Sequence, residues 1–375
     1  MGKAMIYLDN ASTTKPSKKA IEAANSAFSD FGNPSSLHRL GMVAEKIIKE
    51  ARLTVSEKLS VDEKNIFFTS GGTESNNTAI LGYALKNQKN GRHLVTTKIE
   101  HPSVLEPFKY LEKQGFSVTY LGVSKDGVIS LDEFENALTE DTIMVSVMAV
   151  NNETGVIQPI DKLKAIMQKK SPKAVLHSDC VQAFCKIPLH PKKWGVDMLS
   201  VSGHKIHALK GTGALYIAEN VHLDPIILGG GQEKGIRSGT ENTAGIAAFS
   251  AAIKDIKPIS TDKRSELIAK ITAKIPDVKV NGTAENSGYV LNVSFLGIKA
   301  EILLHSLEAK GIYVSTGSAC SSNKPQPSHV LTAMGVGREN IEGAIRFSFC
   351  DDDFDSDYVV SVLAEEARKI RKYVR

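Results

Sequence analysis

Short apolar segments alternate with longer helical stretches along the first two thirds of the chain, and this alternation limits the fold more than any other feature. Residues 142–150 form a continuous apolar run, as expected for a strand that is buried on both faces. The alternation therefore predicts an α/β domain built on a mostly parallel sheet. The expected strands are 65–69, 93–97, 117–121, 142–150, 174–178, 198–202 and 213–217, and the expected helices are 78–85, 103–114 and 160–169.

A second, smaller domain is predicted after a break in the pattern near residue 257. An alanine-rich helix is expected at 240–256, after which Lys257-Pro258 and a polar stretch interrupt it. We expect a large domain at 15–256 and a small α+β domain made of 1–14 and 257–375. The small domain is expected to hold strands at 278–280, 289–295 and 345–349 and helices at 300–310 and 358–373.

Composition narrows the class of protein. Hydrophobic residues make up 42% and charged residues 23%, close to the averages of soluble globular chains, which excludes a disordered or collagen-like protein. The 46 Lys and Arg exceed the 42 Asp and Glu by only four, in short scattered clusters, so no nucleic-acid-binding surface is expected. No apolar run approaches the roughly 20 residues of a membrane helix, and no signal peptide begins the sequence. We expect a soluble, cytoplasmic protein.

The four cysteines fall into two kinds. They are too few for a disulfide framework, and none has the C-x-x-C spacing of a zinc or redox site, so no metal centre is predicted. Cys180, Cys185 and Cys350 have apolar neighbours and are expected to be buried. Cys320 instead lies in a small, polar stretch at 315–323 that suits an exposed loop, and we interpret it as a functional thiol.

Polar residues at the ends of the predicted strands suggest a ligand site. Gly71-Gly72 stands between a strand and a helix, where backbone N–H groups can bind phosphate, although an ordinary turn is an alternative. Asp179 ends another strand and could hold a protonated pyridine nitrogen or merely cap a helix. Lys205, with its polar neighbours, is a candidate Schiff-base nucleophile. His101 could stack on a flat ring, shuttle protons or cap a helix.

Together these segments resemble the NifS/IscS-like cysteine desulfurases, in the aspartate-aminotransferase superfamily of pyridoxal phosphate (PLP) enzymes. The resemblance covers nearly the whole chain, and the serine-rich stretch around Cys320 resembles the long-loop group of the family. It implies a PLP-dependent transferase of fold type I, with the Cys320 loop in the small domain. The motifs that carry it, besides those above, are 7–14 (YLDNASTT), 32–38 (GNPSSLH), 150–155 (VNNETG), 237–242 (RSGTEN) and 345–348 (IRFS).

The resemblance also implies a role for each residue of the cofactor site. Lys205 would carry PLP through a Schiff base and move the Cα proton, while Asp179 would pair with the pyridine N–H. Gln182 would bond the phenolic oxygen of the ring, and His101 would stack on the ring and transfer protons. The phosphate would be held by Gly72, Thr73, Ser202 and His204, and by Thr240 from the second subunit of a homodimer.

The implied reaction converts L-cysteine to L-alanine. Asn152 and Arg346 would hold the substrate carboxylate, for which a guanidinium is well suited. Cys320 would attack the substrate sulfur and carry it as a persulfide to an acceptor protein, for iron–sulfur cluster assembly or for thiolation of tRNA or a cofactor. The sequence ends directly after the last predicted helix, which leaves a dedicated thiolation acceptor open.

Other interpretations would use only part of this set of residues. A selenocysteine lyase, a cysteine sulfinate desulfinase or an aminotransferase would need Lys205 but would not need the thiol of Cys320. An inactive scaffold for sulfur-transfer proteins would not need the complete set of Lys205, Asp179, His101 and Cys320. The desulfurase interpretation is therefore preferred.

Overall fold

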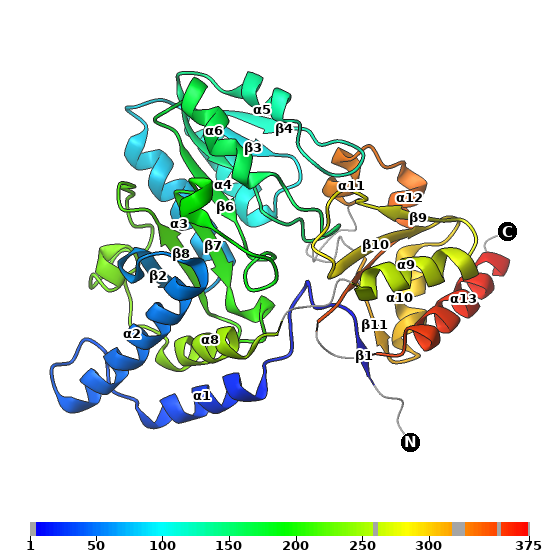
Figure 1. Cartoon of the computed structure of the whole chain (residues 1–375), viewed down its shortest axis with the longest axis horizontal. Coiled ribbons are helices and arrows are strands. Elements are labelled where there is room, and N and C mark those ends of the chain that lie inside the picture. The colour runs from blue at the N-terminus through cyan, green and yellow to red at the C-terminus, as the bar shows by residue number, and fades with distance from the viewer. Residues whose placement is uncertain (1–4, 258–261, 317–326, 351–353, 374–375) are drawn as a thin grey trace.

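The computed structural model describes residues 5–257, 262–316, 327–350 and 354–373. Its main feature is a seven-stranded sheet with the order β2-β8-β7-β6-β5-β3-β4, on the left of Figure 1. Only β8 runs antiparallel to its neighbours, so the predicted mostly parallel α/β sheet is confirmed. The strands are β2 (Ile66–Thr69), β3 (His93–Thr97), β4 (Ser117–Leu121), β5 (Thr142–Ser146), β6 (Val175–Asp179), β7 (Met198–Ser202) and β8 (Gly213–Ile217).

Helices cover both faces of this sheet, which explains the apolar strand sequences. Neighbouring residues such as Leu94 and Val95 belong to opposite hydrophobic clusters, because successive side chains of a strand point to opposite faces. One cluster includes residues of α1, α2, α6 and α8, and the other includes residues of α3 and α4. The helices of this part are α1 (Lys18–Ser29), α2 (Arg39–Leu59), α3 (Gly72–Asn87), α4 (Pro102–Lys113), α5 (Leu131–Ala137), α6 (Ile160–Lys170), α7 (Pro191–Trp194) and α8 (Thr243–Asp255).

The C-terminal part has its own core, on the right of Figure 1. An antiparallel sheet with the order β12-β10-β9 packs with three helices, and a short parallel pair, β1 with β11, brings the N-terminus to the same part. This arrangement supports the division into 15–256 and 1–14 with 257–375, which stays a prediction. The elements are β1 (Ile6–Tyr7), α9 (Asp262–Lys274), β9 (Val278–Asn281), β10 (Val290–Phe295), α10 (Ala300–Glu308), β11 (Ile312–Tyr313), α11 (His329–Ala333), α12 (Arg338–Glu342), β12 (Ala344–Ser348) and α13 (Ser356–Tyr373).

Within the described ranges, no helix is both long and apolar enough to cross a bilayer. The same residues contain no group of three or more His, Cys, Asp or Glu side chains that could hold a metal ion. The predicted burial of Cys180, Cys185 and Cys350 is confirmed. Cys320 lies outside the described residues.

Candidate active site

One cavity of about 280 Å³ gathers the polar residues that follow the ends of β2, β3, β6 and β7. Among the predicted site residues that the structure describes, it contains all except Thr240, although a larger hollow of about 910 Å³ lies beside β1. The smaller cavity is the better candidate because its lining combines acidic, basic and aromatic groups from several strand ends. The predicted residues that line it are Gly72, Thr73, His101, Asn152, Asp179, Gln182, Ser202, His204, Lys205 and Arg346.

The first turn of α3 forms one end of the cavity and suits a phosphate group. Among the described residues, no side chain caps this helix, so its first N–H groups have no side-chain capping partner there. Gly71 has a φ of 149°, and a Cβ on Gly72 would lie 2.6 Å from Val181 Cγ2, so neither position accepts a side chain easily. The Ser202 hydroxyl is buried without a partner among the described atoms. A phosphate would satisfy both the helix N–H groups and this hydroxyl.

Asp179 is held by two neighbours at the end of β6. Its Oδ1 accepts the backbone N–H of Val181 at 2.9 Å in a turn, and no helix begins there, so the helix-capping alternative was wrong. Its Oδ2 accepts Asn76 Nδ2 at 2.7 Å, and Asn76 comes from the buried face of α3. These bonds orient a buried carboxylate toward the cavity, where it can hold a protonated ring nitrogen.

A chain of hydrogen bonds connects Asp179 with His101. The Asn76 amide also donates to Ser103 Oγ at 2.9 Å, and Ser103 Oγ lies 2.8 Å from His101 Nδ1. The backbone N–H of Ser103 donates to the same Nδ1 at 3.1 Å, so His101 is the N-cap of α4 as well as part of the cavity. Because Nδ1 accepts an N–H bond, the proton of the neutral ring lies on Nε2. Burial lowers the pKa of His101, against the opposing effect of Asp179.

Ala11 and Ser12 of the N-terminal segment line the cavity and contact the lysine. Lys205 Nζ donates to the backbone oxygens of Ala11 at 2.7 Å and Ser12 at 2.6 Å. Gln182 Nε2 donates to the same Ala11 oxygen at 2.9 Å. His204 lies beside Thr13, and burial together with the charge of Lys205 lowers the pKa of His204 to about 4. The lysine is therefore held at the edge of the cavity by main-chain oxygens, with a neutral histidine as its neighbour.

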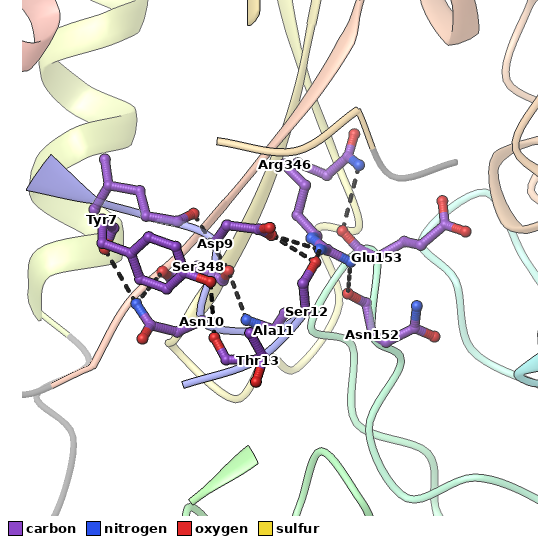
Figure 2. Close-up of polar contacts among 12 residues, drawn as sticks. Tyr7, Asp9, Asn10, Ala11, Ser12, Thr13, Asn152, Glu153, Arg346 and Ser348 are labelled. Carbon is purple, nitrogen blue, oxygen red and sulfur yellow. Dashed lines mark hydrogen bonds and ion pairs between the residues drawn. The ribbon is translucent and has the colours of Figure 1, made fainter. Parts of the chain in front are cut away.

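Arg346 on β12 is fixed by the same segment, as Figure 2 shows. Its Nη2 lies 2.8 Å from Asp9 Oδ1 and 2.6 Å from Ser12 Oγ, and its Nη1 lies 3.1 Å from the backbone oxygen of Asn152. The guanidinium is almost completely buried, and its Nε has no partner among the described atoms. The second N–H of Nη1 remains available to an anionic ligand, since a guanidinium has five N–H donors and Nη1 uses one of its two on Asn152.

A turn after β5 presents Asn152 beside Arg346. The side-chain oxygen of Asn151 accepts the N–H groups of Glu153 and Thr154, and its amide donates to Ile99. These bonds keep the Asn152 main chain in place at the cavity wall. Glu153 in turn accepts the hydroxyl of Ser328, the N-cap of α11, at 2.5 Å.

Several residues of this site were missed by the sequence analysis. Asn76, Ser103, Asp9 and Ser12 received no role, although all four fall within segments that carry the resemblance. Their contacts join positions far apart in the chain, such as Asp9 and Arg346, which are 337 positions apart. Local spacing contains no signal for such pairs. Thr240 is exposed and lies outside the cavity lining.

The residues present fit PLP. The uncapped helix and the unpartnered Ser202 hydroxyl suit the phosphate, and Asp179 suits the pyridine nitrogen. Lys205 supplies the amine that a Schiff base needs, and His101 offers a flat ring at the cavity wall. Arg346 and Asn152 lie in the same cavity and leave donors for a carboxylate.

Comparisons with known proteins agree with this chemistry. The family described as aminotransferase class-V matches residues 6–356. The cysteine desulfurase IscS of Clostridium botulinum is 42% identical over 380 residues, covering 98% of this chain and 95% of that protein. A solved NifS-like protein superposes with a TM-score of 0.88 at 36% identity, covering 99% of both chains. A structure described as SspA in complex with cysteine has a TM-score of 0.84 at 34% identity, covering 93% of this chain and 100% of that one.

Proposed function

Because this chain belongs to the class-V aminotransferase family and is a PLP-dependent cysteine desulfurase, we propose that the cavity residues and Cys320 together convert L-cysteine to L-alanine and a persulfide. The observation that carries the assignment is the single cavity that combines Lys205, Asp179 and Arg346. It offers an amine, a ring-nitrogen partner and a carboxylate partner within about 280 Å³. An amino acid and PLP need these three groups together.

Each cavity residue has a proposed task. PLP, when bound, supplies an electrophilic carbonyl and an electron sink. Asp179 holds the proton on the ring nitrogen, and Lys205 binds the cofactor and afterwards moves the Cα proton. His101 stacks on the ring. The phosphate is held by Gly72, Thr73, Ser202 and His204, which line one cavity.

Arg346 and Asn152 orient the substrate through its carboxylate. The N–H of Nη1 that Arg346 leaves unused can give that carboxylate one charged hydrogen bond. Cys320 attacks the substrate sulfur as a thiolate, so the S–S bond forms while the Cβ–S bond breaks. The net change moves one sulfur to Cys320 and one proton to Cβ, which leaves alanine.

We further propose that the enzyme is a homodimer. Large apolar side chains are exposed on and near α1 and α2, such as Phe28 at 66%, Phe31 at 79% and Leu37 at 98%, and such surfaces mark protein contacts. Thr240 is exposed outside the cavity, as a residue that reaches the phosphate of a second subunit would be. Arg237 lies 3.0 Å from a carboxylate oxygen of Glu74 and so ties the Thr240 segment to the first turn of α3.

The remaining finer proposals concern place and partners. We propose a cytoplasmic enzyme whose persulfide passes to an acceptor protein for iron–sulfur cluster assembly or for thiolation of tRNA or a cofactor. Direct contact with nucleic acid is not proposed, because the basic residues are scattered.

The experiment that tests the function measures alanine and sulfide from L-cysteine and a reductant, without any keto acid. A desulfurase forms both products in equal amounts and continues to turn over. An aminotransferase would stop after one turnover without a keto acid, and that result would overturn the proposal.

A further inference from the structure

Lys186 lies against Gln182, one of the predicted cofactor residues. Lys186 Nζ donates to Gln182 Oε1 at 3.2 Å and lies 4.5 Å from the centroid of the Tyr289 ring. The Tyr289 hydroxyl donates to the backbone oxygen of Gln182. Lys186 therefore holds the side chain of Gln182, and Tyr289 holds its main chain. Lys186 also contacts Tyr289.

These contacts fix the orientation of the Gln182 amide. An ammonium only donates hydrogen bonds and a backbone carbonyl only accepts them, so Oε1 must face Lys186 and Nε2 must face the Ala11 oxygen, 2.9 Å away. Nε2 carries two N–H groups, and one goes to Ala11. The other is available to an acceptor in the cavity that Gln182 lines. The positive charge of Lys186 next to Oε1 polarises the amide of Gln182 and makes the remaining Nε2 N–H a stronger hydrogen-bond donor.

We propose that Lys186 is a positioning residue that holds Gln182 as a hydrogen-bond donor to the phenolic oxygen of PLP and favours the ionised form of that oxygen. The inference rests on the proposed cofactor orientation, in which Gln182 bonds the ring oxygen. In this arrangement Lys186 touches neither cofactor nor substrate and influences the charge of the ring oxygen through Gln182.

The surroundings of Lys186 make its charge responsive to an anion nearby. Burial, followed by the positive charge of Lys205, lowers the pKa of Lys186 to about 7. An ionised ring oxygen on Gln182 opposes this loss of charge, and by linkage each charge favours the other by the same free energy. Among the described residues, the other charged or titratable groups that interact with Lys186 are Cys185, Cys350, Arg346 and His204, and the neighbouring aromatic group is Tyr289.

The test follows the visible absorption of the PLP-loaded enzyme as a function of pH, because the colour of the bound cofactor changes when its ring oxygen ionises. Lys186→Met should raise the apparent pKa of this transition by about one unit, a tenfold change in the ionisation constant. Lys186→Arg keeps the charge and should leave the transition close to that of the wild type. Lys192→Met, at an exposed position of α7, is the matched control and should not move it.

The outcomes separate the possible explanations. An unchanged transition in Lys186→Met with PLP bound would overturn the inference, and so would equal shifts in the Met and Arg variants, which would indicate packing. In a Gln182→Leu background, Lys186→Met should have a much smaller effect. A full effect there would overturn the action through Gln182. A wild-type protein that shows no PLP absorption at all would instead refute the proposed function.

Discussion

Replacing Arg346 by lysine tests how the enzyme holds its substrate. Lysine keeps the positive charge next to Asp9, so the buried ion pair is not left with an unpaired carboxylate, a change that would cost about 3–5 kcal/mol. The ammonium, however, has three donors in place of five, without the planar geometry of a guanidinium. Asp9, Ser12 and the Asn152 oxygen already accept three bonds from Arg346, so a lysine would have none left for the substrate.

The expected loss follows from these contacts. One charged hydrogen bond from Nη1 to the carboxylate is available in the wild type, and losing it costs about 1.5–3 kcal/mol. That range corresponds to a decrease of about 10- to 150-fold in kcat/KM for L-cysteine, mainly through a higher KM. PLP content should stay the same, because the contacts at the phosphate and at Asp179 remain.

The assay is steady-state alanine formation over a range of cysteine concentrations, with PLP content measured on the same samples. Arg338→Lys is the matched control, since the Arg338 side chain is 88% exposed and should have no effect on kcat/KM. A kcat/KM of Arg346→Lys within about threefold of the wild type would correspond to less than 1 kcal/mol and would refute the role given to Arg346.

Three further predictions test other parts of the account. Lys205→Ala should lose the cofactor link that borohydride makes permanent, as read by mass spectrometry, and a PLP adduct on the variant would place the Schiff base elsewhere. Glu100 is completely buried, and burial raises its pKa to about 8, so it binds its proton more tightly in the folded protein. The free energy of unfolding should therefore fall as pH rises from about 4.5 to 8. Glu100→Gln should flatten this pH dependence in urea unfolding, and an equal slope in both proteins would contradict the prediction. Sedimentation should show a dimer, and mixing inactive Lys205→Ala with an inactive Arg237→Ala/Thr240→Ala variant should restore part of the activity; an active monomer would rule out the shared site.

The strands of the large sheet could be predicted closely because their side chains are buried on both faces. The predicted limits of 93–97, 117–121, 198–202 and 213–217 equal those of β3, β4, β7 and β8. The run 142–150 was predicted too long, since β5 ends at Ser146 while the residues after it stay buried outside the sheet. A run of apolar residues indicates that a segment is buried, but it does not show which of those residues pair with a neighbouring strand.

Site residues could be predicted where the local sequence alone indicates both their position and their chemical role. Asp179 and Lys205 each follow an apolar strand, so their place at the carboxyl edge of the sheet could be inferred from the local pattern. Asp9 and Lys186 could not be identified in this way. Asp9 acts on a residue 337 positions away, and Lys186 differs from an ordinary surface lysine only by the contacts that the fold gives it.

The central claim, sulfur transfer to Cys320, is tested most directly by intact-protein and peptide mass spectrometry after brief exposure to L-cysteine. The account predicts one added sulfur on Cys320 in the wild type and none in Cys320→Ser, which should still bind PLP but form no alanine or sulfide, because a serine hydroxyl is too poor a nucleophile at neutral pH. The buried cysteines serve as controls, and Cys180→Ser, Cys185→Ser and Cys350→Ser should each retain the added sulfur on Cys320. Sulfur on Cys350 instead, or undiminished alanine formation by Cys320→Ser, would contradict the account.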